Sequence, residues 1–304
     1  MRFLRPLLAL VTAGAWIGCA LDFSIGPPGD VASTDADVAS LDGTSPLDGA
    51  VNHYGERVTH DLVALWDFEE GQGALVNDRM GSLEPALDLK IDNTALAAWD
   101  KPHALSFRDR TWALSGNAGK KLVATNAKVA AITVEAWIAP ALGTNTESAR
   151  VVVAMAPTTS FGTGGGTTTA GQRAFALGLA VPTRAVTATV DGGVPVDAAT
   201  FSASMAAGSS ELLYGGAPVT ALTHVVAVRS MDERLTLYVD AVNVGVLTGA
   251  AGPANWPNTY PVILGNLVGG GAGFLGDVHL VAIYRAALTA DEVMTNFLAG
   301  ADPP

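Results

Sequence analysis

Short apolar runs separated by turn-forming residues dominate the chain from residue 61 onward. In the run 234–240, Leu235, Leu237 and Val239 share one face, which is the period-two pattern of a half-buried strand. About a dozen such runs with frequent Gly, Pro, Asn and Asp between them indicate a sandwich of two sheets. The predicted strands are 62–68, 103–107, 121–124, 132–139, 150–156, 173–180, 184–190, 223–229, 234–240, 242–247, 261–264 and 276–284.

One segment near the end has helical periodicity instead. Thr289 is followed three residues later by Glu292, which is the capping-box pattern of a helix start. Val293 and Phe297 then lie on one helical face, and Gly300 is suited to end the helix. Because a parallel α/β fold needs many crossover helices, the pattern predicts an all-β antiparallel sandwich with one short C-terminal helix.

The first residues have the pattern of a secretory signal peptide. Arg2 and Arg5 precede an apolar run over 6–17, which is too short for a spanning helix of about 20 residues. Small residues follow, so we assign 1–18 to the signal peptide. The segment 16–19 resembles the bacterial lipoprotein signal, which implies lipidation of Cys19, although Trp16 stands where that signal usually has an aliphatic residue. Cleavage after residues 13–15, releasing a soluble protein, is the alternative.

Residues 19–60 are predicted to form an acidic, disordered tether. Positions 20–60 hold seven acidic residues and one arginine, with few large apolar side chains to offset chain entropy. The folded domain is then expected over 61–300, followed by a tail of 301–304. With lipid on Cys19, we expect a secreted protein of the outer membrane or cell surface that contacts the membrane through its N-terminal lipid alone.

Composition excludes several classes of protein and site. The chain has 17 Lys and Arg against 29 Asp and Glu, a formal net charge of −12, which argues against a nucleic-acid partner. A single cysteine cannot form an internal disulfide or a thiolate-rich zinc site. With 49% hydrophobic and 15% charged residues, the chain can bury a core.

Four segments follow one another in a familiar order. They are LVALWDFEEGQG at 62–73, ITVEAWIAP at 132–140, THVVAV with LTLYVD at 223–228 and 235–240, and FLG through IYRAALT at 274–289. Together they resemble the LamG-like jelly-roll family of the concanavalin A-like lectin/glucanase superfamily. The resemblance implies a two-sheet antiparallel jelly roll with ligand sites on a concave face or at its rim.

The resemblance also bears on a metal. An acidic position that often contributes to calcium sites in relatives aligns with His279 here, so Asp277 and Asp78 are the remaining candidate ligands for calcium. In the alternative, Asp78 forms an Asx turn and Asp277 is a solvated strand residue. We expect no other cofactor.

Catalytic signatures are missing from the sequence. Retaining glucanases of the superfamily carry ExDxxE on one strand, and the chain has no such motif; Glu135 is the single acid of its predicted strand. There is also no HExxH and no GxSxG. We therefore expect a protein that is not an enzyme, with a divergent glycoside hydrolase as the less favoured alternative.

Aromatic residues in predicted loops are the candidates for ligand contact, because their faces can stack on sugar rings. Trp99 and Trp112 are two of them, and the segment PANWPNTY supplies Trp256, Asn258 and Tyr260, the predicted ligand-binding residues. In the alternative, Trp256 covers one end of the core. The expected function is a surface-displayed module that binds a glycan or a surface protein. A structural or assembly component without a small ligand is the second possibility.

Overall fold

The computed structural model describes most of the chain after residue 56. The described residues are 57–81, 86–116, 119–122, 131–141, 150–158, 174–180, 200–204, 212–215, 221–250, 256–257, 259–268 and 273–301. Cys19, the predicted signal peptide, most of the predicted tether and the predicted strand 184–190 lie outside these ranges, so they stay predictions.

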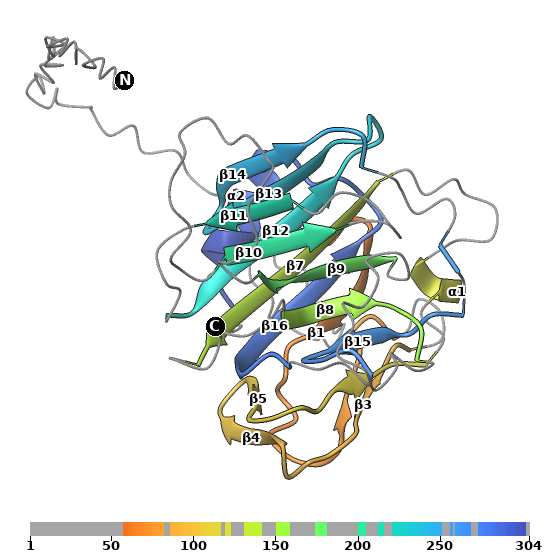
Figure 1. The fold of residues 1–304 in the computed structure, drawn as a ribbon, viewed down its shortest axis with the longest axis vertical. Helices are drawn as coiled ribbons and strands as arrows, with labels where there is room; N and C mark the ends of the chain where they lie inside the picture. Colours follow the sequence, from red (N-terminus) through yellow and green to blue (C-terminus); the bar gives the residue numbers. More distant parts are fainter. Residues whose placement is uncertain are drawn as a thin grey trace, which may run out of the picture. The chain divides into compact units, whose positions relative to one another are not determined.

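The described strands form two antiparallel sheets of eight strands each (Figure 1). Sheet A has the order β14 (Val242–Leu247), β13 (Leu235–Val239), β12 (Thr223–Arg229), β7 (Ile132–Pro140), β16 (Gly276–Tyr284), β5 (Ala104–Phe107) and β4 (Ala97–Lys101), and β1 (Leu62–Trp66) also pairs with β16. Sheet B has the order β11 (Leu212–Gly215), β10 (Thr200–Ser204), β9 (Phe175–Ala180), β8 (Arg150–Met155), β15 (Val262–Leu264), β6 (Ala113–Leu114), β3 (Leu89–Ile91) and β2 (Leu75–Val76).

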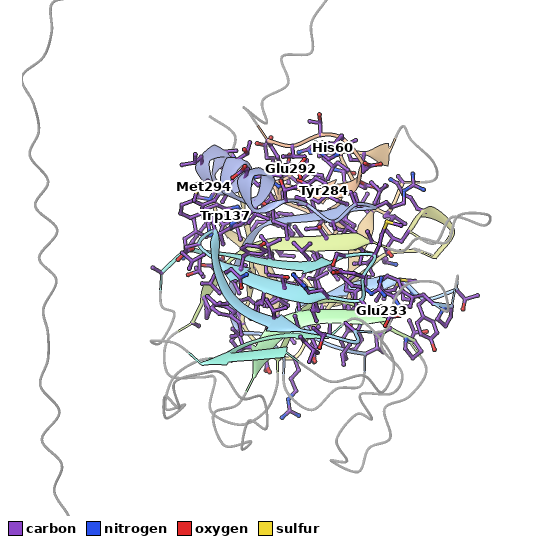
Figure 2. All side chains as sticks on the ribbon, turned by 90° about the horizontal axis from the view of Figure 1, so that it is seen from above. His60, Trp137, Glu233, Tyr284, Glu292 and Met294 are labelled. Carbon is purple, nitrogen blue, oxygen red and sulfur yellow. The ribbon has the colours of Figure 1, made fainter. Side chains whose placement is uncertain are left out.

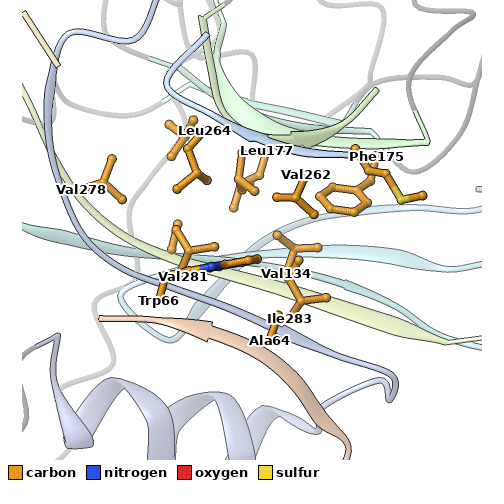
Figure 3. Close-up of a cluster of buried hydrophobic side chains, with 14 of the residues drawn as sticks. Ala64, Trp66, Val134, Phe175, Leu177, Val262, Leu264, Val278, Val281 and Ile283 are labelled. Atoms are coloured by element: carbon orange, nitrogen blue, oxygen red, sulfur yellow. The ribbon is translucent and has the colours of Figure 1, made fainter. Parts of the chain in front are cut away.

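The core lies between the two sheets (Figure 3). Along β7, Val134 and Ala136 point into this core, so the side chain of Glu135 between them points to the outer face of sheet A. Sheet B contributes residues such as Phe175 and Leu177 from its inner face. The predicted all-β antiparallel sandwich is confirmed.

Helix α2 (Ala290–Ala299) packs on the outer face of sheet A, on the far side of β1 and β16 from the core (Figure 3). The predicted capping box is present: the Glu292 amide donates to Thr289 Oγ1 at 3.3 Å, and the Thr289 amide donates to the Glu292 carboxylate at 2.7 Å. Gly300 ends the helix with φ +79°. None of the described helices has the length and apolar character that crossing a bilayer requires.

The prediction of a strand over 121–124 is wrong for 121–122, and 123–124 lie outside the described residues. Residues Gly119–Leu122 form a short helix, α1, and Lys121 is 3% exposed. Its ammonium group donates to the Asp78 carboxylate and to the Met80 carbonyl, the latter at 2.9 Å. These long-range contacts override the local strand propensity of a lysine- and valine-containing run.

The β13–β14 hairpin turns through two residues in the left-handed region, Asp240 at φ +48° and Ala241 at φ +61°. Positive φ at both central residues is typical of the type I′ turn. Asp240 Oδ1 accepts from the amide of His224 on the neighbouring strand β12 at 3.0 Å, a contact that ties the turn to sheet A. The methyl side chain of Ala241 cannot form such a hydrogen bond. An L residue with a Cβ is strained at this φ, so the backbone strain at Ala241 is not offset in the same way.

Replacing Ala241 with glycine is therefore expected to raise the free energy of unfolding by about 0.5–1 kcal/mol. The relieved strain exceeds the greater chain entropy of glycine in the unfolded state and the loss of a partly buried methyl group. Urea unfolding of Ala241→Gly beside the parent protein measures the change. A lower midpoint would show that the methyl contact outweighs the strain.

Candidate functional site

A buried polar cluster lies between sheet A and α2. Asn296 Nδ2 donates to Glu135 Oε2 at 2.7 Å, His224 Nε2 lies 3.0 Å from Oε1, and the Tyr284 hydroxyl lies 3.4 Å from Oε2. Arg57 Nη1 also donates to Oε1, and all these side chains are buried. The Glu135 cluster is the set Arg57, Glu135, His224, Tyr284 and Asn296.

The electrostatics of the cluster keep Glu135 ionised. Burial alone would raise its pKa, but the charge of Arg57 and the hydrogen bond from His224 lower the pKa to about 2. Burial, with the Glu135 charge, raises the pKa of Tyr284, which therefore stays a neutral phenol. A carboxylate that is ionised, fully buried and hydrogen-bonded by four groups is suited to hold the fold together, not to transfer a proton to a substrate.

Aromatic rings cover one side of this cluster. Trp137 stacks on His224 with ring centroids 4.7 Å apart and on Phe297 of α2 at 5.7 Å. Figure 2 shows Trp137, Tyr284 and Glu292 on the α2 side of the domain. The outer face of sheet A is therefore occupied by the helix and these rings in the region of the cluster.

Asp78 organises a turn next to the opening strand. Its carboxylate accepts from the amides of Leu65 at 3.2 Å, Met80 at 2.9 Å and Leu87 at 3.0 Å, and pairs with the ammonium group of Lys121. The bond from Met80, two residues on, is that of an Asx turn. The carboxylate of Asp78 is thus engaged within the chain, as the alternative to calcium expected.

Asp277 lies elsewhere. It accepts from Ser106 Oγ at 2.6 Å and pairs with Lys101. The strand register places Leu65, the neighbour of Asp78, opposite Ala282, five residues or about 16 Å along β16 from Asp277. The structure does not bring the two carboxylates together, and the described residues hold no group of three or more His, Cys, Asp or Glu that could bind a metal. Calcium binding stays a prediction without geometric support.

The predicted ligand-binding segment is only partly described. Trp256 is 7% exposed, and its ring centroid lies 5.5 Å from that of Phe175 within the core. Tyr260 is half-buried against the same core, and Asn258 lies outside the described residues. Because the Trp256 ring is packed in the core, its role as a ligand contact stays a prediction that these contacts do not support.

A different aromatic residue lies at the outer face of sheet B. The strand register aligns Lys90, Leu114, Ile263 and Ala154 in one row across β3, β6, β15 and β8. Ile263 and Ala154 are fully buried in a small apolar cluster on this face, against which the half-buried Trp112 and Leu114 pack. The row continues through the exposed Lys90 to Leu75, which is 46% exposed. The Trp112 strip is defined as Leu75, Lys90, Trp112 and Leu114.

The Trp112 strip combines an aromatic ring, aliphatic side chains and an amine on one sheet face. Such a surface can stack on an apolar ring face while the lysine donates hydrogen bonds. Sequence reasoning placed Trp112 among loop aromatics without selecting it. The alternation of Trp112 and Leu114 around Ala113 is a period-two signal that could have placed both on one strand face.

Comparisons with solved structures show likeness at the level of the fold. Trypanosoma rangeli sialidase in complex with 2,3-difluoro-KDN is 16% identical with a TM-score of 0.54, and 81% of this chain covers 34% of that chain. The binding domain of botulinum neurotoxin serotype D/C is 8% identical with a TM-score of 0.54, and 79% of this chain covers 52% of that chain. The protein thus spans about a third of the sialidase and about half of the toxin chain. No curated protein matches the sequence.

A family model matches one long, continuous region of the sequence. The model is Laminin_G_3, described as Concanavalin A-like lectin/glucanases superfamily, and it matches residues 114–294, more than half of the chain. The matched region includes β7, β12, β13 and β16, the centre of sheet A. The chain therefore belongs to the concanavalin A-like lectin/glucanases superfamily.

Proposed function

We propose that this protein is a non-catalytic module that binds carbohydrate through the Trp112 strip. The observation that carries the proposal is a half-buried tryptophan on an outer sheet face, beside the aliphatic Leu114 and the exposed Lys90. A pyranose has an apolar C–H face, which matches the Trp112 ring, and a rim of polar hydroxyl groups, which matches the Lys90 amine. The superfamily includes lectins, and the toxin domain with the same fold is named a binding domain, which supports this assignment.

The absence of catalysis is part of the proposal. A glycosidase needs two carboxyl groups facing the scissile bond, about 5–5.5 Å apart if retaining and about 6.5–9.5 Å apart if inverting. The buried or partly buried carboxylates of Glu135, Asp78 and Asp277 each pair with a cation from the same chain. Carboxylates engaged in this way are poorly suited to protonate a leaving group, although about a third of a Trypanosoma rangeli sialidase chain has a similar fold.

The proposal is tested with the full chain on an array of neutral and sialylated glycans. We expect Trp112→Ala to weaken binding at least about tenfold, since loss of ring stacking costs on the order of 1.4 kcal/mol. Trp112→Phe keeps a ring and should retain most of the affinity. Met231→Ala, which changes an apolar side chain that is 75% exposed at a hairpin tip, is the matched surface control.

Three results would count against this function. Binding of Trp112→Ala at the wild-type level would remove the strip from the site. Failure of the wild-type protein to bind any glycan would favour the assembly role instead, and release of free sugar from the arrayed glycans would reveal an enzyme.

A further inference from the structure

The first described residues form a strap along α2. Arg57 Nη2 donates to the Gly300 carbonyl, the Val58 amide donates to Asn296 Oδ1 at 2.9 Å, and His60 Nε2 lies 2.6 Å from Glu292 Oε1. The positions on the helix side are four residues apart, so the contacts follow one face of α2. Residues 57–60, hereafter the strap, therefore run antiparallel to the helix from its C-terminal end to its first turn.

The two ends of the strap differ in burial. His60 and Glu292 meet in solvent, where an ion pair contributes little. Arg57 is 5% exposed, although it lies within the predicted tether 19–60, so the last residues of that predicted tether, 57–60, belong to the folded domain instead. An arginine is rarely buried unless its charge is paired, so the Arg57 end fixes the strap.

The acceptors around Arg57 are arranged for a planar cation. The terminal nitrogen Nη1 of the guanidinium donates to Glu135 of β7, and the terminal nitrogen Nη2 donates to the Gly300 carbonyl at the end of α2. These acceptors come from different elements, and a forked, planar group can reach both at once, whereas a lysine ammonium is a single point charge. The C-terminal end of a helix also favours a positive charge.

The remaining partners of Glu135 orient the site without replacing the cation. His224, Tyr284 and Asn296 are 0% exposed, and each contacts one of the two carboxylate oxygens. Asn296 Nδ2 also donates to the Tyr284 hydroxyl at 2.9 Å, which fixes the amide and the phenol relative to each other. The Glu135 carboxylate is therefore held in place by groups other than Arg57 itself.

We propose that Glu135 and the Gly300 carbonyl form a guanidinium-binding socket that Arg57 occupies in cis, and that filling the socket holds α2 on sheet A. Emptying the socket leaves a buried carboxylate without its cation beneath the last turn of the helix. A small guanidinium compound supplied from solution has the same donor fork as the arginine side chain and should refill the socket.

Chemical rescue of Arg57→Ala in the full chain tests the socket. We expect the variant to melt about 10 °C below the wild type, because one partner of a buried ion pair has been removed. Ethylguanidinium at about 10 mM, roughly ten times a millimolar Kd, should restore about a third of this loss by mass action. Ethylammonium at the same concentration should not, and Arg57→Lys should be only partly stable and insensitive to both compounds.

The control is His60→Ala, which removes the exposed contact of the strap and leaves the socket filled. Its melting temperature should stay within about 2 °C of the wild type, with no response to ethylguanidinium. An Arg57→Ala protein as stable as the wild type, equal rescue by both cations, or no rescue would each overturn the proposal.

If Arg57→Ala does not fold on its own, refolding from urea gives the same information. The yield of soluble, folded protein should rise at least about threefold when ethylguanidinium, but not ethylammonium, is present in the refolding buffer. Equal yields with the two compounds would contradict a specific socket.

Discussion

Replacing Glu135 by glutamine is expected to lower the free energy of unfolding by about 3–5 kcal/mol at pH 7. Glutamine nearly matches the shape of the side chain, but it leaves Arg57 as a buried charge without an ionic partner. It also presents an amide NH₂ where a carboxylate oxygen accepts hydrogen bonds. Urea unfolding followed by tryptophan fluorescence measures the loss.

The same substitution should change the response to acid. The pKa of Glu135 is lowered to about 2, against 4.5 for an ordinary glutamate, so the unfolded chain takes up a proton where the native carboxylate does not. The stabilisation that the ionised Glu135 carboxylate gives to the folded state is complete above about pH 4.5 and is lost as the pH falls toward 2. This pKa difference corresponds to about 3 kcal/mol. The difference in the free energy of unfolding between wild type and Glu135→Gln should therefore decrease by about that amount as the pH falls over this range.

Glu233→Gln is the control for this experiment, because Glu233 is an exposed hairpin residue (Figure 2). It should shift the free energy of unfolding by less than about 0.5 kcal/mol at pH 7. Parallel pH profiles for wild type and Glu135→Gln would show that the ionisation of Glu135 does not contribute to stability.

Replacing Gly276 by alanine is expected to cost about 3 kcal/mol or more, and to reduce the yield of folded protein. Gly276 has φ +137°, and a Cβ there would lie 2.4 Å from the Ala139 carbonyl oxygen and 2.8 Å from Pro140 Cα. These atoms belong to the backbone of β7, which pairs with β16 at the centre of sheet A. The clash therefore cannot be relieved by rotating a side chain.

Gly249→Ala separates the clash from the backbone strain. Gly249 has φ +73°, but nothing lies within 4 Å of an added Cβ. This variant should lose about 1 kcal/mol, the cost of a left-handed alanine alone. If the two variants are equally destabilised in urea, contact with β7 is not the reason for glycine at 276.

The long strands and α2 could be predicted from the sequence because local pattern and tertiary environment agree there. The bounds 223–229, 242–247 and 276–284 coincide with β12, β14 and β16. The two-residue strands β2 and β6 escaped prediction because so few residues carry no periodicity. Helix α1 was missed because the burial of Lys121 against Asp78, a contact across 43 residues, decides its conformation.

The Glu135 cluster could not be predicted for a related reason. Glu135 is the single acid of β7, and its partners come from positions as distant as Arg57 and Asn296. No local spacing links these residues, so only the pairing of the strands and the packing of α2 brings them together. His224 belongs to β12, which pairs with β7, and this pairing places its ring beside the Glu135 carboxylate.

The pairing of β1 with β16 has a consequence for the synthesis of the protein. Leu62 and Tyr284 are opposite each other in sheet A, and β16 also carries β7 and β5. Contacts this distant in sequence give a high contact order and slow folding. A nascent chain that has reached residue 270 lacks the strand that joins β1, β5 and β7, so sheet A cannot assemble until residues 276–284 have been synthesised.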